Sequence, residues 1–278
     1  MPGPWIRGDP PRTFKEGAIS IRVAVLGSGS SGNCTFLSTN RTKILVDAGF
    51  SHREILRRLA GLGETPDTLQ GILITHEHSD HISGLERLAK KYRIPVYLSA
   101  LTRAALPAKS DLPAVETIAA GKPFQIGDLM VEPFTIPHDA VDPMAFRMSA
   151  EGLCVALATD LGYMPENVKH YLRGCHCLIV ESNHDLEMLR NGPYPWYVKQ
   201  RVMARTGHLS NGTLAEFLRQ DYDGAARVMV LAHLSEQNNH PQIARLEAST
   251  ALEGRAAPGK PGRLVVSSQS EPTELFEF

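Results

Sequence analysis

Four side chains that can bind a metal ion lie within six residues, from His76 to His81. The segment reads His-Glu-His-Ser-Asp-His and follows an apolar run over residues 71–75 that predicts a buried strand. Imidazole and carboxylate groups are common ligands of divalent metals, and a loop that opens into a helix can turn all four groups toward one point. We therefore predict that His76, His78, Asp80 and His81 bind metal.

This segment matches neither of two common zinc motifs. The H-E-x-x-H helix needs a histidine where this chain has Asp80, and a structural zinc finger needs paired cysteines, which the segment lacks. Three histidines and an aspartate exceed the ligands that one open tetrahedral site requires. We therefore expect two neighbouring divalent ions, and these ligand types suit Zn²⁺ or Mn²⁺.

Further candidate ligands lie downstream, each at the end of an apolar run that predicts a strand. They are His138, Asp160 and His233. Asp47 also ends such a run, over residues 43–47, and we expect its carboxylate to orient a ligating imidazole from behind.

A glycine-rich loop over residues 27–32 reads Gly-Ser-Gly-Ser-Ser-Gly and matches the dinucleotide-binding pattern G-x-G-x-x-G. That pattern needs a helix to open at its third glycine, whereas residues 33–47 predict a strand, a turn and a second strand. We therefore interpret the loop as a tight hairpin connection. A second interpretation is a nest of backbone N–H groups that binds a phosphate, helped by the side chains of Ser28, Ser30, Ser31 and Asn33.

The predicted ligands need a scaffold that brings several strand ends together. Runs rich in β-forming residues predict strands over residues 19–26, 33–38, 43–47, 71–75, 96–99, 129–136, 145–150, 153–159, 227–233 and 263–267. Helical spacing of apolar residues predicts helices over 51–62, 84–92, 165–172, 184–190, 197–205, 211–220 and 243–252.

The order of these elements indicates the fold class. The strands come in groups of two or three with helices between the groups, which favours two packed sheets flanked by helices over strict βαβ alternation. We predict an α/β fold, a single αββα sandwich domain of two mixed sheets over residues 19–278. A flexible extension rich in proline and glycine is expected over residues 1–18.

The overall charge limits how the chain could bind nucleic acid. It has 278 residues, with 29 Lys and Arg against 30 Asp and Glu, and a formal net charge of −1. A wholly basic surface is excluded, so a nucleic-acid partner would need a local patch. The candidate basic groups are Arg53, Arg57 and Arg58; Lys90, Lys91 and Arg93; and Lys199, Arg201 and Arg205.

The cysteine content and the absence of long apolar runs indicate the compartment. Four cysteines without a C-x-x-C pair predict reduced thiols, and no run approaches the roughly 18 apolar residues of a membrane span. The N-terminal residues have no apolar stretch of the kind found in secretory signals. We therefore expect a cytoplasmic protein with no membrane association.

The pattern His76-x-His78-x-Asp80-His81, with Asp47, His138, Asp160 and His233 at later strand ends, resembles the metallo-β-lactamase fold over roughly residues 19–270. The resemblance implies that His76, His78 and His138 hold one metal ion. It implies that Asp80, His81 and His233 hold the other and that Asp160 bridges the two. Because one fold hosts many reactions, the resemblance says less about the substrate.

Further motifs narrow the resemblance to one branch of that superfamily. They are Ser28–Asn33, Glu181–Asp185, Gly192–Pro195, Gly207–Asn211 and His233–Ser235, and together they look like the YycJ/WalJ branch. That branch is associated with exonuclease action on DNA. Asp160 and His233 stand only 73 positions apart, which we interpret as leaving no room for the large cap domain of the β-CASP nucleases.

Polar segments near the ends of the later strands supply candidate catalytic and substrate-binding groups. We propose that His208 contacts the scissile phosphate or protonates the leaving oxygen, with His184 as a further catalytic candidate beside Asp80. Asn183, Ser210 and Asn211 are the candidate hydrogen-bond donors to substrate. A structural interpretation is also open, in which Ser210 caps the helix that starts at Asn211 and His208 is a loop residue.

These observations lead to one preferred function and two alternatives. The preferred one is a two-metal phosphodiesterase, a 5′-to-3′ DNA exonuclease acting at duplex ends in DNA repair, in which a hydroxide between the ions attacks the scissile phosphate. Direction and pathway come from the resemblance alone. The alternatives are a small-molecule hydrolase of the same fold, which would cut a thioester, lactone or cyclic phosphodiester, and a metal- or nucleotide-binding regulator with little turnover.

Overall fold

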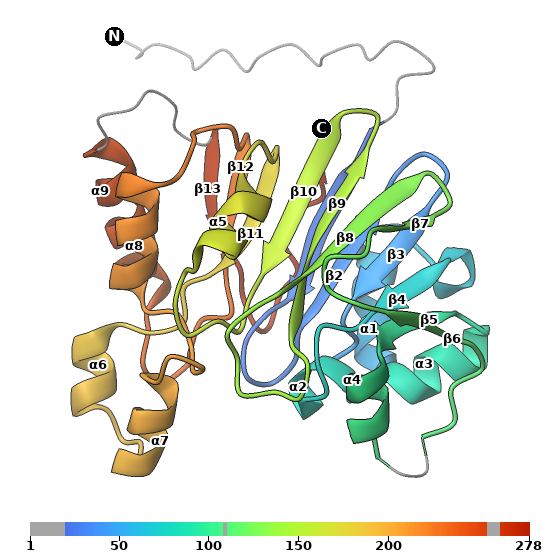
Figure 1. Cartoon of the computed structure of the whole chain (residues 1–278), viewed down its shortest axis with the longest axis horizontal. Helices are drawn as coiled ribbons and strands as arrows, with labels where there is room; N and C mark the ends of the chain where they lie inside the picture. Colours follow the sequence, from blue (N-terminus) through green and yellow to red (C-terminus); the bar gives the residue numbers. More distant parts are fainter. Residues whose placement is uncertain (1–19, 108–109, 255–261) are drawn as a thin grey trace, which may run out of the picture.

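The computed structural model of the chain describes residues 20–107, 110–254 and 262–278. In these residues two seven-stranded sheets pack face to face, with helices on both outer sides (Figure 1). The flexible extension predicted for residues 1–18 lies outside the described residues.

The two sheets divide the chain almost in sequence order. The first has the strand order β14-β1-β2-β3-β4-β5-β6 and the second β13-β12-β11-β10-β9-β8-β7. The strands of the first sheet are β1 (Arg22–Gly27), β2 (Cys34–Ser38), β3 (Lys43–Val46), β4 (Gly71–Leu73), β5 (Val96–Ser99), β6 (Val115–Ile118) and β14 (Phe276–Glu277). Those of the second are β7 (Phe124–Ile126), β8 (Leu129–Thr135), β9 (Met144–Ala150), β10 (Leu153–Ala158), β11 (Cys177–Glu181), β12 (Val228–Ala232) and β13 (Arg263–Val266).

The helices lie outside the sheets or at one end of them. They are α1 (His52–Gly61), α2 (Ser79–Ile82), α3 (Leu85–Tyr92), α4 (Ala100–Ala105), α5 (Glu166–Leu172), α6 (Leu186–Asn191), α7 (Trp196–Val202), α8 (Asn211–Gln220) and α9 (Pro241–Glu253), with a single 3₁₀ turn at Pro66–Thr68. In Figure 1, α2, α6 and α7 lie at the lower end of the sandwich.

Three apolar clusters hold these layers together. The cluster between the sheets includes Val23, Val46, Phe146 and Ile179. A second cluster packs α1 and α3 against the outer face of the first sheet, and a third packs α5, α8 and α9 against the second. Burial of apolar surface on both faces of each sheet is the main stabilising contribution, and the predicted αββα sandwich is confirmed.

Parallel pairing brings the ligand-bearing strand ends to one edge. In the second sheet, β10, β11, β12 and β13 run parallel, and in the first, β3, β4, β5 and β6 do. The carboxyl ends of parallel strands meet at the same edge of a sheet, which is where open α/β sheets bind ligands.

Four strands were absent from the sequence prediction. The edge strands β6, β7 and β14 span two to four residues and include exposed positions, so their pattern is weak. The strand β11 is buried at all five positions and therefore shows no polar–apolar alternation. The glycine loop leads into strand β2 and not into a helix, which confirms the exclusion of a dinucleotide-binding loop.

Candidate metal centre

The histidine-rich segment leaves strand β4 and turns into the short helix α2. His78 has an extended backbone (φ −62°, ψ 146°) and precedes the first helical residue, so the chain reverses its direction between His76 and His81. His76 and His81 are fully buried, while Asp80 keeps 21% of its side chain exposed. The loop-to-helix turn predicted from the sequence brings all four side chains to one site.

The first ligand group contains three imidazoles, those of His76, His78 and His138. Their ring nitrogens lie within 4.8 Å of one another. His78 Nδ1 is 3.1 Å from His76 Nε2 and 3.3 Å from His138 Nε2. His138 comes from the loop that follows β8, so this group joins the two sheets.

The second ligand group contains Asp80, His81 and His233. Asp80 Oδ2 lies 3.4 Å from His81 Nε2 and 3.6 Å from His233 Nε2. His233 follows β12 directly. The set is compact enough for one ion, since its ligand atoms also lie within 4.8 Å of one another.

Asp160 lies between the two groups. Its Oδ1 is 3.3 Å from His233 Nε2 and 4.0 Å from His138 Nε2, and its Oδ2 is 3.4 Å from His81 Nε2. A carboxylate in this position can contact an ion in each group, which agrees with the bridging place predicted for it.

Two buried atoms of this cluster indicate that a cation fits it. Asp160 Oδ2 and His233 Nε2 are shielded from solvent and make no hydrogen bond within the described part of the chain. Unpaired buried polar atoms are costly, and a divalent cation would satisfy both. The donor set of imidazoles and carboxylates is the one that Zn²⁺ and Mn²⁺ accept.

The pKa shifts within the cluster also indicate that it suits a cation. Burial lowers the pKa of His76 well below its ordinary value, helped by the neighbouring imidazoles of His81 and His138. Burial also opposes charge on His233, but Asp160, Asp80 and Glu181 outweigh it and raise the pKa of His233 to about 10. The carboxylates therefore create a negative field that protons or metal ions must neutralise.

Three of the strand-end residues adopt a backbone conformation that is rare outside glycine. Asp47, Asp160 and His233 have φ values of 61°, 61° and 56°. Aspartate and histidine tolerate this left-handed region better than most residues, and such conformations cluster at functional sites. The sharp bend lets each side chain leave its strand toward the same point.

Asp47 holds His81 from behind, as the sequence predicted. Its Oδ2 is 2.8 Å from His81 Nδ1, and its carboxylate also accepts hydrogen bonds from the backbone N–H and the hydroxyl of Thr75. Burial raises the pKa of Asp47, an effect that His81 and Thr75 oppose. This contact fixes the ring so that Nε2 faces Asp80 and Asp160.

Glu181 is a site residue to which the sequence analysis assigned no role, although it begins the motif Glu181–Asp185. It ends β11, is fully buried, and lies 2.8 Å from His208 Nδ1 and 3.1 Å from His233 Nδ1. It also accepts the backbone N–H groups of Leu161 and Leu209. Burial would raise its pKa, but His208 and His233 lower it. The sequence feature that could have identified Glu181 is its position, because it is a carboxylate at the end of an apolar run, as Asp47 and Asp160 are.

His208 is placed at the site by Glu181. Its ring lies 5.1 Å from that of His233 and 5.3 Å from that of His138, measured between centroids, and its side chain keeps 19% exposure. Because Glu181 engages Nδ1, Nε2 is the nitrogen left to face solvent or substrate.

The remaining predicted residues of this region form a buried polar network behind the ligands. Asn183 donates to the carbonyl of His233, and the Ser210 hydroxyl accepts from Thr213 N as the cap of α8. Asn211 accepts from Ser182, while His184 is 1% exposed and belongs to no ligand group among the described residues. The structure thus supports the capping interpretation of Ser210, and substrate contacts by Asn183, Asn211 and His184 stay predictions.

The glycine loop and Asn33 form hydrogen bonds that support the metal-site residues Asp80 and His233. Four of the loop's backbone N–H groups, those of residues 28, 29, 31 and 32, already donate within the protein, as does the N–H of Asn33 directly after it. Ser28 donates to Asn33 and accepts from His233 N, and Asn33 Nδ2 lies 3.2 Å from Asp80 Oδ2. The prediction of a free phosphate-binding nest is therefore wrong. Ser30 and Ser31 are exposed, and their contact with substrate stays a prediction.

The structure changes the interpretation of the three candidate basic groups. Arg58 is buried and donates to backbone carbonyls of residues 26, 269 and 270, Arg57 pairs with Glu54, and Lys90 pairs with Asp111. Lys199 is also buried and donates to the Arg190 carbonyl, so its assignment to a DNA-binding patch is wrong. Arg201 and Arg205 remain exposed beside the site.

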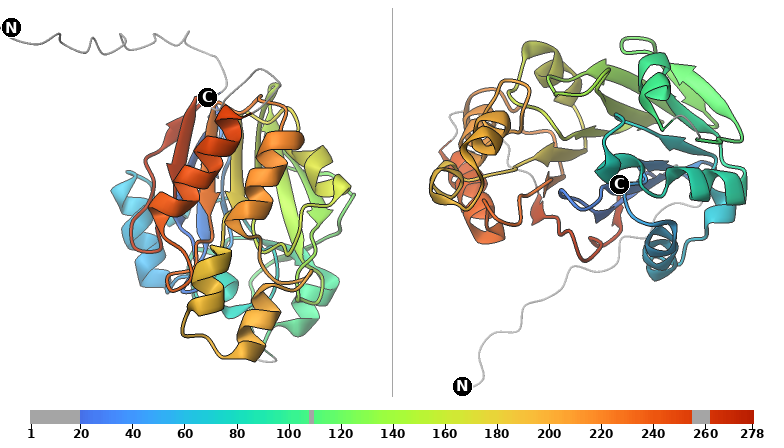
Figure 2. Two further views of the ribbon diagram at one scale, coloured as in Figure 1. Left: turned by 90° about the vertical axis from the view of Figure 1, so that its left-hand side faces the viewer. Right: turned by 90° about the horizontal axis from the view of Figure 1, so that it is seen from below.

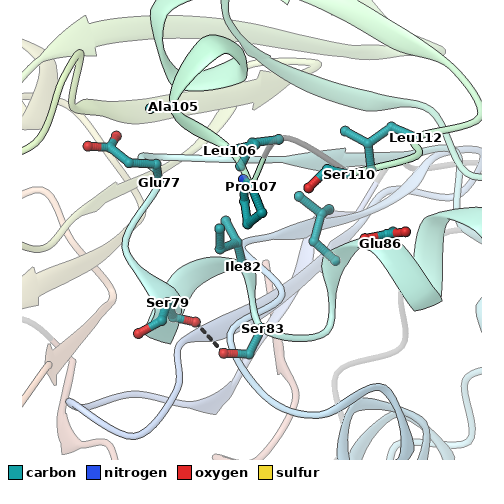
Figure 3. A pocket seen from close by; sticks show the side chains of 11 residues that line it. Glu77, Ser79, Ile82, Ser83, Glu86, Ala105, Leu106, Pro107, Ser110 and Leu112 are labelled. Carbon is teal, nitrogen blue, oxygen red and sulfur yellow. Dashed lines mark hydrogen bonds between the residues drawn. The ribbon is translucent and has the colours of Figure 1, made fainter.

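A hollow of about 390 Å³ lies against the helix that carries Asp80 and His81 (Figure 3). Its apolar walls include Ile82, Leu106 and Pro107, and its polar groups include Glu77 and Ser79. Glu77 accepts the backbone N–H of Val141 from across the site. The acidic side chain makes this hollow unsuited to a phosphate.

Comparisons with known proteins agree with this geometry. The sequence profile described as Beta-lactamase superfamily domain matches residues 42–234. The chain is 37% identical over 233 residues to "Exodeoxyribonuclease WalJ" of Streptococcus pneumoniae, covering 82% of this chain and 87% of the relative. It is 38% identical over 242 residues to "Exodeoxyribonuclease YycJ" of Bacillus anthracis, covering 84% and 90%.

A solved structure extends the likeness to the fold. The metallo-beta-lactamase fold protein YhfI from Bacillus subtilis superposes with a TM-score of 0.72 at 17% identity, covering 94% of this chain and all of that one. None of the described helices is long and apolar enough to cross a membrane. The matched residues include every ligand of both groups, and the chain belongs to the β-lactamase superfamily, in the family of the WalJ and YycJ proteins.

Proposed function

We propose that this protein is a metal-dependent phosphodiesterase that removes nucleotides from DNA ends. The observation that carries the proposal is the joining of two complete ligand groups by Asp160, in a chain 37–38% identical over most of its length to two curated exodeoxyribonucleases. Two divalent ions held by these ligand groups would supply Lewis acidity and would activate water for attack on phosphorus.

The ligand assignment follows the two groups. We assign His76, His78 and His138 to one ion, Asp80, His81 and His233 to the other, and Asp160 to both. Asp47 orients His81, and Glu181 orients His233 through Nδ1. Carboxylates that hold the far nitrogen of a ligating imidazole fix its tautomer and its direction.

We assign proton transfer to His208. Glu181 engages its Nδ1 at 2.8 Å and so favours the tautomer with a proton there, which leaves Nε2 on the open side of the ring. When the ring is protonated, Nε2–H can donate a proton to the leaving oxygen, and the Glu181 carboxylate stabilises the imidazolium. Because Glu181 is fully buried, its carboxylate is shielded from solvent and stays directed at Nδ1 of His208.

The finer features of the substrate are further parts of the proposal. We propose action in the 5′-to-3′ direction at duplex ends, Zn²⁺ or Mn²⁺ as the ions, a role in DNA repair, and a cytoplasmic location. The two relatives are exodeoxyribonucleases, which supports DNA as the substrate. Four free cysteines among the described residues are compatible with a reducing compartment.

The test compares hydrolysis of two substrate classes by the metal-loaded protein. Duplex DNA labelled at the 5′ or the 3′ end is incubated with the wild type and with Asp80→Ala, and a thioester is offered in parallel. We expect nucleotides to leave one end with the wild type and not with the variant. Rapid thioester hydrolysis without any cleavage of nucleic acid would instead identify a small-molecule hydrolase.

A further inference from the structure

Helix α7 carries two large aromatic side chains that point into solvent. Trp196 is 64% and Tyr197 73% exposed. Eight large hydrophobic side chains are strongly exposed in the described residues, and four of them lie between residues 186 and 203, the other two being Leu186 and Met203. Exposed apolar side chains that gather in one part of the chain mark a candidate interaction surface.

This helix is tied directly to the metal centre. Arg201 Nε donates to Asp139 at 2.5 Å, and Asp139 is the neighbour of His138 in the chain. His208 N donates to the carbonyl of Val202, the last residue of α7. The C-terminal end of the helix therefore contacts the loops that carry a ligand and the proposed proton donor. The left view of Figure 2 shows α6 and α7, gold to orange, at the lower end of the molecule.

Helical spacing places Tyr197 on the side of Arg201. Residues four apart share a helix face, with Cβ atoms about 5–6 Å apart. Tyr197 therefore stands one turn beyond the arginine that reaches the metal-site loop. Trp196 precedes Tyr197 in the first turn, about 100° away around the helix axis, so the two exposed rings lie on adjacent faces of the same element.

The charge around the rings indicates the class of partner. From Pro193 to Gly207 the chain contains three basic residues and no acidic one. Lys199 is turned inward, but Arg201 and Arg205 are exposed, and the Arg205 guanidinium lies 4.2 Å from the centre of the Tyr163 ring. Exposed rings beside arginines are the arrangement with which proteins hold unpaired nucleic acid, because every base offers a face for stacking.

We propose that α7 is a stacking platform for unpaired nucleobases of the strand that enters the metal centre. Tyr197 and Trp196 supply the rings, and Arg205 attracts the phosphates between the bases. This inference rests on the proposed nuclease function, since it assigns the substrate's bases to a surface beside the same site. It adds a preference for DNA ends with unpaired nucleotides.

Fluorescence of Trp196 tests the contact without relying on turnover. The chain has two tryptophans, so Trp5→Phe leaves Trp196 as the sole reporter. The metal-loaded full-length variant is titrated with a single-stranded phosphorothioate oligonucleotide, which resists hydrolysis, and with an abasic oligonucleotide of equal length. We expect quenching by the first and little by the second. Equal responses to both would show that phosphates alone are bound and would overturn the platform.

A pair of variants separates this inference from the proposed function. Trp196→Ala/Tyr197→Ala is expected to bind the oligonucleotide about 10-fold or more weakly, with unchanged melting temperature and unchanged hydrolysis of a small activated phosphodiester. The matched control is Leu246→Ala, since Leu246 is 66% exposed on α9.

Each outcome decides between the two proposals. Wild-type cleavage and affinity in the double variant would overturn the platform and leave the nuclease intact. Oligonucleotide quenching without DNA cleavage by the wild type would overturn the nuclease and leave base binding standing. Loss of a dimer in the double variant, measured by sedimentation, with unchanged DNA affinity would identify the surface as a protein interface and overturn the platform.

Discussion

His208 and Glu181 form the pair of side chains on which proton transfer depends. Replacement of His208 by alanine removes the donor, and we expect kcat to fall by about 100-fold or more while both metal ions stay bound. The matched control is His170→Ala, an exposed histidine on α5 that we expect to leave kcat unchanged. Turnover of labelled DNA and metal content by elemental analysis measure the two effects.

The same experiment separates a proton donor from a ligand. A ring nitrogen of His208 lies within 4.8 Å of possible ligand atoms of Asp160, Glu181 and His233, so these four residues could themselves hold an ion. If the alanine variant lost one metal ion, His208 would be a ligand and the proposed role in proton transfer would be wrong.

Asp160 is a carboxylate whose oxygens lie close to histidines of both ligand groups. In Asp160→Asn the amide keeps the shape of the side chain but removes the negative charge from a fully buried position. We expect the protein to retain about one ion in place of two and to lose nearly all turnover, because the shared ligand is needed to hold the pair together. An unchanged content of two ions, measured after dialysis, would contradict the bridging assignment.

Asp47 acts on the site through His81 and does not reach the ions itself. Asp47→Asn is expected to weaken metal affinity by about 10- to 100-fold, since the imidazole loses the anion that orients it. Competition with a fluorescent chelator measures the affinity. Restoration of activity at high metal concentration would distinguish this positioning role from direct ligation.

At the scale of elements, the turn at Gly49 sets where α2 can lie. A Cβ atom at this residue would lie 1.7 Å from the backbone oxygen of Asp80, so a side chain would push the ligand helix away. Gly49→Ala is therefore expected to lose metal and activity. Gly61→Ala, at the end of α1 with nothing within 4 Å of the new Cβ, is the matched control.

The comparison of the two glycine variants is made by metal content and melting temperature. For Gly61→Ala we expect wild-type metal content and an equal or higher melting temperature, because alanine is the better helix former. Full metal occupancy in Gly49→Ala would show that α2 adapts, and the close approach would then not be what fixes the ligands.

At the scale of the molecule, the metal centre connects the two sheets. His76, His78, Asp80 and His81 follow β4 in the first sheet, and His138, Asp160 and His233 follow strands of the second. Chelation is expected to lower the melting temperature by about 5–10 °C, because bound ions stabilise only the folded chain. Calorimetry with and without chelator measures the change, and a similar shift in Asp160→Asn would contradict this explanation.

The pH dependence of stability has a contribution from His184. Burial lowers the pKa of its ring from 6.5 to about 4, so between these values the unfolded chain binds a proton that the folded chain does not. Stability from this group is present above pH 6.5 and falls by about 3 kcal/mol as the pH drops to 4. Urea unfolding at several pH values should show a flatter dependence in His184→Gln, and equal slopes would exclude this contribution.

The sequence alone was sufficient to predict the fold class and to name residues that the structure brings together at one site. Residues such as His76, His78, Asp80 and His81 stand so close together that any turn brings them near one point. The later ligands follow long apolar runs, and strand ends are predictable because buried parallel strands have strong patterns. The net charge of −1 argues against a generally basic surface, which stays a prediction from the sequence.

Only the tertiary structure decided which charges and polar groups are free to act. Lys199 and Arg58 look like surface cations in sequence but donate to backbone carbonyls. The Ser28 hydroxyl accepts the His233 N–H, and the Asn33 N–H donates to the Asp80 carbonyl, so these groups brace the site. Glu181 was missed because its importance comes from two histidines 27 and 52 positions away. Sequence spacing determines local patterns, whereas burial and hydrogen-bond partners depend on contacts between residues far apart in the chain.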